Sequence, residues 1–346
     1  MNGLILFVAF IFILWIGSSI FIPLLVATFL WYLINATATY YRKLFPACEE
    51  DRCGIPKRLF NLLSTLLSIA TFVGLIYLFI TRVRPMFSEL LAAMPGIQVR
   101  LNGLWNYISY TLDIDITDIA LPNITTIVSS VGSSVAKIAA SFGMVIVYMI
   151  FMFVEQSTFH KKFAELFPNK SHGKKMRYII NSIDENMKKY LFMKTLISGI
   201  TGLASFAWMW ILGLEFAGVW AFVIFILSYI PTIGAIIGCG LPILFGAISG
   251  ATLNELVLLA MGLIGLQIVF GNIIEPKLTG KTLNLSTLAI LINLVFWGLI
   301  WGVAGMFFSV PLLVAVFIIT AQFDSTRWVA ILLSADGEIP DKNEED

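Results

Sequence analysis

The most restrictive feature of this sequence is a long C-terminal stretch, Thr195 to Phe323, that is almost free of charge. Its only charged residues are Glu215, Glu255, Glu275, Lys277 and Lys281. A helix that crosses a bilayer needs about 20 consecutive apolar residues, and this stretch can supply several such helices. Hydrophobic residues make up 59% of the chain and charged residues 12%, against about 45–50% and about 25% in soluble domains. One globular core cannot bury this excess, so the sequence predicts an all-α polytopic membrane protein.

The charge and cysteine content argue against several other classes. The formal net charge is +1, which gives no electrostatic reason to expect a nucleic-acid partner. We interpret Cys48, Cys53 and Cys239 as reduced thiols, because a structural zinc site usually needs four Cys or His ligands. No cofactor and no metal is expected. The opening MNGLILFVAF has no basic region and no small-residue cleavage site, which predicts a retained first span rather than a removed signal peptide.

Residues 1–81 are expected to hold the N-terminal transmembrane helices. The run from Leu4 to Ile34 carries no charge, which is too long for one spanning helix and short for two. Gly17 and Pro23 suggest a break between two closely joined helices. A basic loop follows at 42–58, and the third span then extends to the end of this region.

Three further segments complete the N-terminal half. Residues 82–135 combine apolar residues at helical spacing with three aspartates, which predicts a small extracytoplasmic subdomain of amphipathic helices. Residues 136–154 are predicted to be a transmembrane helix. Residues 155–194 are strongly basic with one apolar helical face, and by the positive-inside rule this helical loop and the loop at 42–58 are cytoplasmic. Both termini, including the acidic tail 323–346, are then expected in the cytoplasm.

The C-terminal transmembrane core, residues 195–322, contains several apolar runs. They lie at about 195–213, 216–249, 253–270 and 286–322. The second and fourth are too long for single spans, and each is interrupted, at Tyr229–Gly234 and at Trp301–Gly305. Such interruptions are typical of discontinuous or re-entrant helices in transporters. We therefore expect about eight transmembrane helices, with a range of about seven to ten that depends on how broken segments are counted.

The polar interruption GNIIEPKLTGKTLNLS, between the last two runs, has two interpretations. In the first it is a short cytoplasmic loop. Asn272 would then end one helix and Pro276 would hold Glu275 in an extended conformation. Asn284 or Ser286 would cap the next helix.

In the second interpretation, Glu275 and Lys277 form a partly buried pair in a loop that dips into a protein-lined cavity. A carboxylate in that setting could titrate and couple protons. The triplet at 280–282, Gly-Lys-Thr, does not make a phosphate-binding loop, because the required earlier glycine is replaced by Glu275 and no strand precedes it. A built-in ATPase is therefore not expected.

A second candidate segment is SYIPTIGAIIGCG, residues 228–240. Pro231 frees a backbone carbonyl, Tyr229 and Thr232 supply hydroxyls, and Gly234 allows close approach of another backbone. One interpretation is helix packing, since glycines four positions apart form a small-xxx-small pair. The other is an unwound turn that lines a substrate path. Both can hold at once.

Lys194 and Ser198 lie four positions apart, on one face of a predicted helix. The lysine either extends to the membrane interface or lies beside a cavity. The membrane region shows no Ser/His/Asp set, no paired carboxylates and no metal-ligand spacing, so the chain is not expected to be an enzyme.

Three segments resemble the autoinducer-2 exporter family of bacterial membrane proteins. They are YLFMKTLISGITGL (190–203), FILSYIPTIGAIIG (225–238) and FGNIIEPKLTGKTLNLSTLAILINLVFWGLIWGVAGMFFSVPLL (270–313). The matching family pattern has a proline-glycine turn, then N-x-x-x-P-[KR], L-x-L-S, F-W-G, G-x-x-G-M and V-P. It is met here by Pro231/Gly234, Asn272/Pro276/Lys277, Leu283/Leu285/Ser286, Phe296/Trp297/Gly298, Gly302/Gly305/Met306 and Val310/Pro311.

The resemblance implies a multi-pass transporter of the bacterial inner membrane with a small-molecule substrate, a membrane-lipid environment and a homo-oligomeric state, pentameric in known members. Our main hypothesis is export of a small polar metabolite or signal such as autoinducer-2. The substrate path or gate would be formed by Tyr229, Pro231, Thr232, Gly234, Asn272, Glu275, Pro276, Lys277, Gly298, Gly302 and Gly305. Lys194 and Ser198 would face the cavity.

Two alternatives remain open at this point. A sodium/proton antiporter, an activity also ascribed to some family members, would need a titrating carboxylate in the core, and intramembrane acids are scarce in this sequence. A non-transporting membrane scaffold would instead use the 82–135 subdomain to bind a partner.

Overall fold

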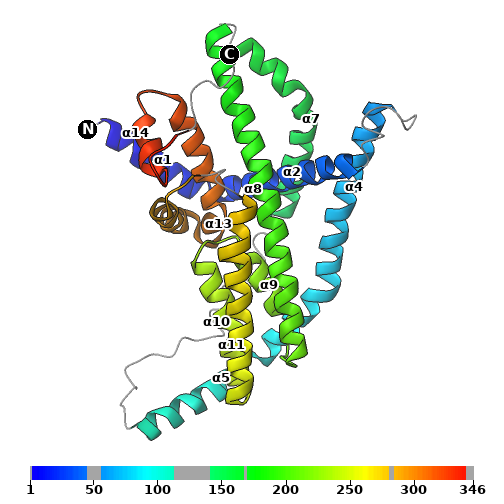
Figure 1. Ribbon diagram of the computed structural model, residues 1–346, viewed down its shortest axis with the longest axis vertical. Coiled ribbons are helices and arrows are strands. Elements are labelled where there is room, and N and C mark those ends of the chain that lie inside the picture. Colours follow the sequence, from blue (N-terminus) through cyan, green and yellow to red (C-terminus); the bar gives the residue numbers. More distant parts are fainter. Residues whose placement is uncertain (1, 45–55, 113–140, 167–169, 280–283, 340–346) are drawn as a thin grey trace. The chain divides into compact units, whose positions relative to one another are not determined.

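The computed structural model describes residues 2–44, 56–112, 141–166, 170–279 and 284–339 (Figure 1). These residues are mainly helical, and the β-pairing among them is one isolated bridge between Leu285 and Ser334. The longer helices are α1 (Asn2–Ile16), α2 (Ser18–Leu44), α4 (Lys57–Leu78), α5 (Arg84–Leu112), α7 (Phe142–Leu166), α8 (Lys170–Ile211), α9 (Ala217–Leu227), α10 (Ile233–Ile248), α11 (Leu253–Gln267) and α13 (Thr287–Gln322). Shorter pieces are η1 (Phe79–Val83), η2 (Ile268–Ile274), α12 (Glu275–Thr279) and α14 (Arg327–Leu333).

The predicted all-α membrane fold is confirmed. In the part of the chain that the structure describes, five helices are long and apolar enough to cross a bilayer, and shorter apolar helices accompany them. The predicted break at Gly17 is confirmed as well, since α1 ends at Ile16 and α2 begins at Ser18. Pro23 does not contribute to the break, because it lies inside α2.

Helix α4 shows how the side chains are sorted for a lipid environment. Its buried residues are Phe60, Ser64 and Ser68, which follow one another at intervals of four. Other apolar side chains point the other way, and Leu66 and Val73 are both more than half exposed. In water this arrangement would be unfavourable, whereas in a bilayer small residues allow helices to pack closely and leucines contact the lipid tails.

The chain packs as two compact units. The first holds residues 1–72, 140–194 and 276–346, and the second holds residues 73–139 and 195–275. Helices α4 and α8 run from one unit into the other. The two units are defined by which residues pack together and not by the side of the membrane on which they lie. The predicted extracytoplasmic and cytoplasmic segments therefore remain predictions.

In the first unit the basic segment of α8 contributes an apolar face to the core. Ile179, Met187 and Tyr190 are buried there against Leu33 of α2 and Val314 of α13. The helical face predicted within 155–194 is therefore confirmed. The segment is not a separate loop, however, because α7 extends to Leu166 and α8 is continuous from Lys170 to Ile211.

In the second unit α5 packs against the core formed by α8 to α11. Leu90 and Met94 of α5 are buried together with Met209, Trp220 and Leu263. Residues 84–112 form one helix with Pro95 inside it, and not the several short helices expected at the start of the 82–135 subdomain. The rest of that subdomain lies outside the described residues.

Helices α9 and α10 form a hairpin around the predicted break at 229–234. Both arms are short: α9 is about 16 Å long and α10 about 24 Å at 1.5 Å per residue. Neither reaches the about 30 Å of a hydrocarbon core, which is the geometry of a re-entrant hairpin. A Cβ on Gly234 would overlap the carbonyl oxygen of Leu227 in the opposite arm. The glycine is therefore required by the close approach of the two arms.

Helix α13 forms a second hairpin, whose two helical arms meet at Gly302. Gly302 has φ 62° and ψ −140°, which breaks the helix. The Asn293 side chain donates a 2.6 Å hydrogen bond to the Ser309 carbonyl, although sixteen residues of straight helix would separate them by about 24 Å. A Cβ on Gly305 would also overlap the Trp297 carbonyl. The predicted break at 301–305 is thus confirmed as a sharp reversal.

The expected loop over GNIIEPKLTGKTLNLS is helical as far as Thr279, and its residues 280–283 lie outside the described residues. The π-helix η2 covers Ile268–Ile274 and passes directly into α12. Glu275 has φ −56° and ψ −51°, which is helical and not extended. Pro276 is the second residue of α12, and because proline has no N–H it cannot donate a helical hydrogen bond back to η2. Ser286 does occupy the N-cap position of α13, but its side chain makes no capping hydrogen bond.

Candidate functional site

The tip of the α9–α10 hairpin brings together two sets of predicted site residues. Tyr229 is buried, with 4% of its surface exposed, and its hydroxyl donates a 2.7 Å hydrogen bond to Thr195 Oγ1 of α8. Ser198 lies one turn further along the same face of α8. Its hydroxyl is buried and has no hydrogen-bond partner among the described residues. The structure therefore places Tyr229 and Ser198 on one packed pair of helices.

The backbone at this tip is strained at one position. Thr232 has φ 59° and ψ −61°, an unusual conformation for a β-branched residue. It is exposed, whereas Tyr229 and Ile230 are buried. Backbone strain of this kind persists only where the surrounding structure imposes it.

The α8 face that packs on α9 is lined with small polar residues. Ser198, Thr201 and Ser205 are all buried, and a Cβ on Gly202 would touch Phe225 and the carbonyl of Ala221. Thr201 donates to the Ile197 carbonyl of its own helix. Most of this face is therefore explained by helix packing. Lys194 is only 6% exposed, so its side chain is covered by protein.

The remaining predicted residues fall into two groups. Asn272, Pro276 and Lys277 are exposed on η2 and α12, and Glu275 is half-buried. Glu275 and Lys277 lie two positions apart on a helix, a spacing at which side chains do not face each other.

The second group, Gly298, Gly302 and Gly305, lies in the α13 hairpin. A Cβ on Gly298 would press on Met306 of the opposite arm, and Gly302 is exposed at the reversal. These glycines shape the hairpin through their lack of a side chain, so they offer no chemical group to a solute.

The first unit contains a polar cleft that the sequence did not predict. It has a volume of about 420 Å³ and is lined by residues of α2, α4, α7 and α8. Its lining residues are Asn35, Thr39, Arg42, Asn61, Leu62, Thr65, Phe153, Gln156 and Lys188. Seven of these nine residues are polar or charged, although α2, α4 and α7 are mostly apolar. Polar groups in membrane helices are energetically expensive and usually mark a functional path.

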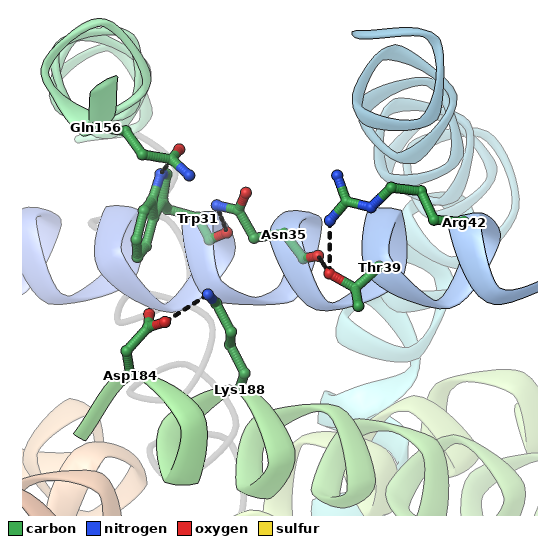
Figure 2. Close-up of polar contacts among 7 residues, drawn as sticks. All are labelled: Trp31, Asn35, Thr39, Arg42, Gln156, Asp184 and Lys188. Atoms are coloured by element: carbon green, nitrogen blue, oxygen red, sulfur yellow. Dashed lines mark hydrogen bonds and ion pairs between the residues drawn. The ribbon is translucent and has the colours of Figure 1, made fainter. Parts of the chain in front are cut away.

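Hydrogen bonds hold the cleft side chains in place along α2 (Figure 2). Arg42 Nη2 donates to Thr39 Oγ1 at 2.7 Å, and Thr39 Oγ1 donates to the Asn35 carbonyl at 2.9 Å. The Asn35 amide donates to the Trp31 carbonyl, and the Trp31 indole donates to Gln156 Oε1 of α7 at 3.2 Å. The lining is thus an ordered network and not a set of independent side chains.

Lys188 extends from α8 toward α2 in Figure 2. Its ammonium group forms an ion pair of 2.6 Å with Asp184, one turn earlier on the same helix. Both side chains are about one third exposed, so this pair contributes little to stability. The pair does place one positive and one negative charge near the cleft, of which Lys188 belongs to the lining.

The sequence did carry a signal for this cleft. Asn35, Thr39 and Arg42 follow at intervals of four and three, which is one face of α2, and Asn61 and Thr65 are four apart on α4. Residues three or four positions apart are neighbours on the surface of a helix. This stripe is inconspicuous in the sequence, because four of its five residues are uncharged.

Three features of this structure are typical of a membrane transport protein. They are apolar helices with exposed leucines, re-entrant hairpins, and a polar cleft among the spanning helices. The chain belongs to the AI-2E transporter family, whose family model matches residues 4–324. This confirms the family resemblance. The match covers nearly the whole chain, including both hairpins and all helices that line the cleft.

Several curated relatives are transport proteins. The AI-2 transport protein TqsA of Escherichia coli (strain K12) is 33% identical over 240 residues, which is 69% of this chain and 65% of TqsA. A putative transport protein of Haemophilus influenzae is 34% identical over 223 residues, 63% of this chain and 62% of that protein. The putative transport protein YueF of Bacillus subtilis is 24% identical over 317 residues, 85% and 81% of the two chains. The match thus spans less than two thirds of the first two relatives.

Proposed function

We propose that this protein exports a small polar metabolite or signal of the autoinducer-2 type across the bacterial inner membrane. The observation that carries the proposal is the polar cleft lined by α2, α4, α7 and α8. Its volume of about 420 Å³ lies within the about 300–1,000 Å³ of small-molecule sites. TqsA, a relative named for AI-2 transport, supports this choice of substrate. The family of transport proteins also supports a role other than catalysis.

The position of the cleft supports the export direction. Arg42 lies in the last turn of α2, beside the basic loop that the positive-inside rule assigns to the cytoplasm. Asn35 lies seven residues earlier, about 10 Å deeper along the helix. The cleft would therefore open at the cytoplasmic surface and extend into the membrane, where a solute from the cell interior can load.

The two hairpins and Glu275 are proposed as the moving parts of the path. Discontinuous helices in transporters form sites and gates where backbone is not held in a regular helix. Glu275 follows a π-helical segment, and such segments are frequent at functional sites. We further propose that the protein assembles as a homo-oligomer, a pentamer by analogy with the family, with both termini in the cytoplasm.

The test uses the purified full chain in liposomes. Flux of labelled autoinducer-2 is measured with and without proton and sodium gradients, while a pH-sensitive dye reports proton movement. Saturable flux supports the proposal, and its response to the gradients shows whether transport is coupled. A sodium-dependent dye response without autoinducer-2 flux would instead assign a sodium/proton antiporter.

Two matched variants connect flux to the cleft. Asn61→Leu removes an amide from the lining and is expected to reduce flux roughly tenfold, because polar groups of the solute lose a partner. Asn254→Leu makes the same change at an exposed position of α11 and should leave flux unchanged. Equal flux in both variants would place the path elsewhere. Glu275→Gln tests the proposed gate in the same assay, with Glu215→Gln as its control.

A further inference from the structure

The cleft is asymmetric in charge. Arg42 and Lys188 are the two charged residues among its nine lining residues, and both are cations. They come from different helices, α2 and α8. Asp184 pairs with Lys188 but does not line the cleft. A solute in the cleft therefore meets two cations at its wall, one of which is paired with a carboxylate.

The internal hydrogen bonds of the lining leave several donors for a ligand. Gln156 Oε1 accepts from the Trp31 indole, and since an indole can only donate, the Gln156 NH₂ group is directed elsewhere. Thr39 Oγ1 both accepts from Arg42 and donates to Asn35, so its hydroxyl is occupied. Among the described residues Arg42 uses one of its five N–H donors in this way.

The resulting donor set matches one kind of chemical group. A guanidinium presents paired N–H groups that fit the oxygens of a carboxylate or phosphate, and such charge-assisted hydrogen bonds are about twice as strong as neutral ones. The Lys188 ammonium adds a second positive charge, and the Gln156 amide adds a neutral donor. A neutral sugar or an organic cation would leave these donors poorly used.

We propose that the cleft is an oxyanion site, which takes a phosphate-type group through Arg42, Lys188 and Gln156. The inference rests on the proposed function only in treating the bound molecule as cargo. The same chemistry is offered by a soluble phosphorylated or otherwise anionic metabolite and by the headgroup of an anionic phospholipid. Basic pockets between membrane helices on the cytoplasmic side bind such headgroups, so the experiment separates the two sources.

The first arm tests the soluble source. The full chain is placed in nanodiscs of phosphatidylcholine, and binding of radiolabelled inorganic phosphate is measured by equilibrium dialysis. Arg42→Gln and Lys188→Gln are each expected to weaken binding at least about tenfold, the loss of one charge-assisted contact. Arg58→Gln removes an exposed cation of α4 that does not line the cleft, and it should bind as the wild type does.

Asp184→Asn provides a test with the opposite sign. Removing this carboxylate releases Lys188 from its ion pair and lowers the negative charge near the cleft. Phosphate binding is therefore expected to strengthen about two- to fivefold. If Lys188 served only to hold α8 through Asp184, both Lys188→Gln and Asp184→Asn would weaken binding or leave it unchanged. That outcome would overturn the proposed role of Lys188.

The second arm tests the lipid source. The same proteins are placed in nanodiscs that contain phosphatidylglycerol, and the lipid retained after exchange into phosphatidylcholine is measured by mass spectrometry. Retention that is lost in Arg42→Gln, without binding of soluble phosphate, supports the oxyanion site and assigns it to a headgroup. The inference is overturned if the wild-type chain shows neither phosphate binding nor lipid retention. It is also overturned if Arg42→Gln and Arg58→Gln give equal values.

This result is separable from the proposed function. If the wild-type chain transports autoinducer-2 while binding no phosphate and retaining no anionic lipid, the oxyanion site is wrong and the transporter assignment stands. If oxyanion binding follows the expected order of variants but autoinducer-2 is not moved, the site is correct and the cargo is a different anion.

Discussion

The two hairpins, α9–α10 in the second unit and α13 in the first, reach the same shape by different means. In both, a glycine removes the side chain where the arms meet: Gly234 against Leu227, and Gly305 against Trp297. The α9–α10 hairpin reverses over five residues, 228–232, between two separate helices. The α13 hairpin reverses at Gly302 alone, which has non-helical φ and ψ.

They also differ in how their tips are held. In α13 the arms are joined to each other by the bond from Asn293 to the Ser309 carbonyl, and the Trp301 indole donates to the Leu14 carbonyl of α1 at 2.9 Å. The α9–α10 tip is instead tied to α8 by the bond from Tyr229 to Thr195. The α13 hairpin is thus fastened both across its own arms and to α1, whereas the α9–α10 tip is fastened to α8. This difference predicts different responses to mutation.

The largest effect is expected where the hairpins are alike. Gly234→Ala and Gly305→Ala each place a Cβ on a backbone carbonyl, and overpacking against rigid backbone costs about 3 kcal/mol or more. Both variants should lose most of their monodisperse protein in detergent or show a strongly lowered Tm. Gly240→Ala is the control, because a Cβ there meets nothing within 4 Å. Normal behaviour of Gly305→Ala alone would mean that the α13 arms are not closely packed.

The next effect separates the two turns. Gly302 has open space around it, so Gly302→Ala is destabilising only through its backbone conformation, by about 1–3 kcal/mol. Thr232→Gly has the opposite sign, because it relieves the strained φ of 59°. A raised Tm for Thr232→Gly and a lowered Tm for Gly302→Ala are the expected results. Two changes of the same sign would contradict the assignment of strain to Thr232.

A smaller effect tests the fastening across α13. Asn293→Leu removes the donor to Ser309 and the acceptor of the Trp297 indole, which is expected to lower stability by about 1–2 kcal/mol. The measurement is the Tm of the purified protein in detergent. Asn254→Leu, at an exposed position of α11, controls for the loss of an amide in general. An unchanged Tm for Asn293→Leu would show that packing at Gly305 alone holds the arms together.

The smallest effect on stability is expected for Tyr229→Phe. Side-chain hydrogen bonds between membrane helices contribute about 0.6 kcal/mol on average, so removing the bond to Thr195 should hardly change the Tm. Flux of labelled autoinducer-2 is the sharper readout. If the hairpin tip moves during transport, flux changes clearly while the Tm does not. If both stay at the wild-type value, the tip is a static packing element.

Much of the fold followed from the sequence. Long charge-free runs fix where helices can cross a bilayer, because each ionisable residue in lipid is expensive. Pro231, Gly234, Gly302 and Gly305 marked both reversals correctly, since these residues act through the local backbone. The apolar face of residues 155–194 was visible for the same reason, as helical periodicity is a local property.

Two features depended on tertiary structure. Residues 271–279 carry the polar and proline signals of a loop, yet they are helical, as the π-helix η2 followed by α12. The polar cleft needed the packing of α2, α4, α7 and α8 together. A polar stripe on one helix shows only which face is polar. Whether that face meets other polar faces or a wall of leucines is decided by contacts between segments far apart in the sequence.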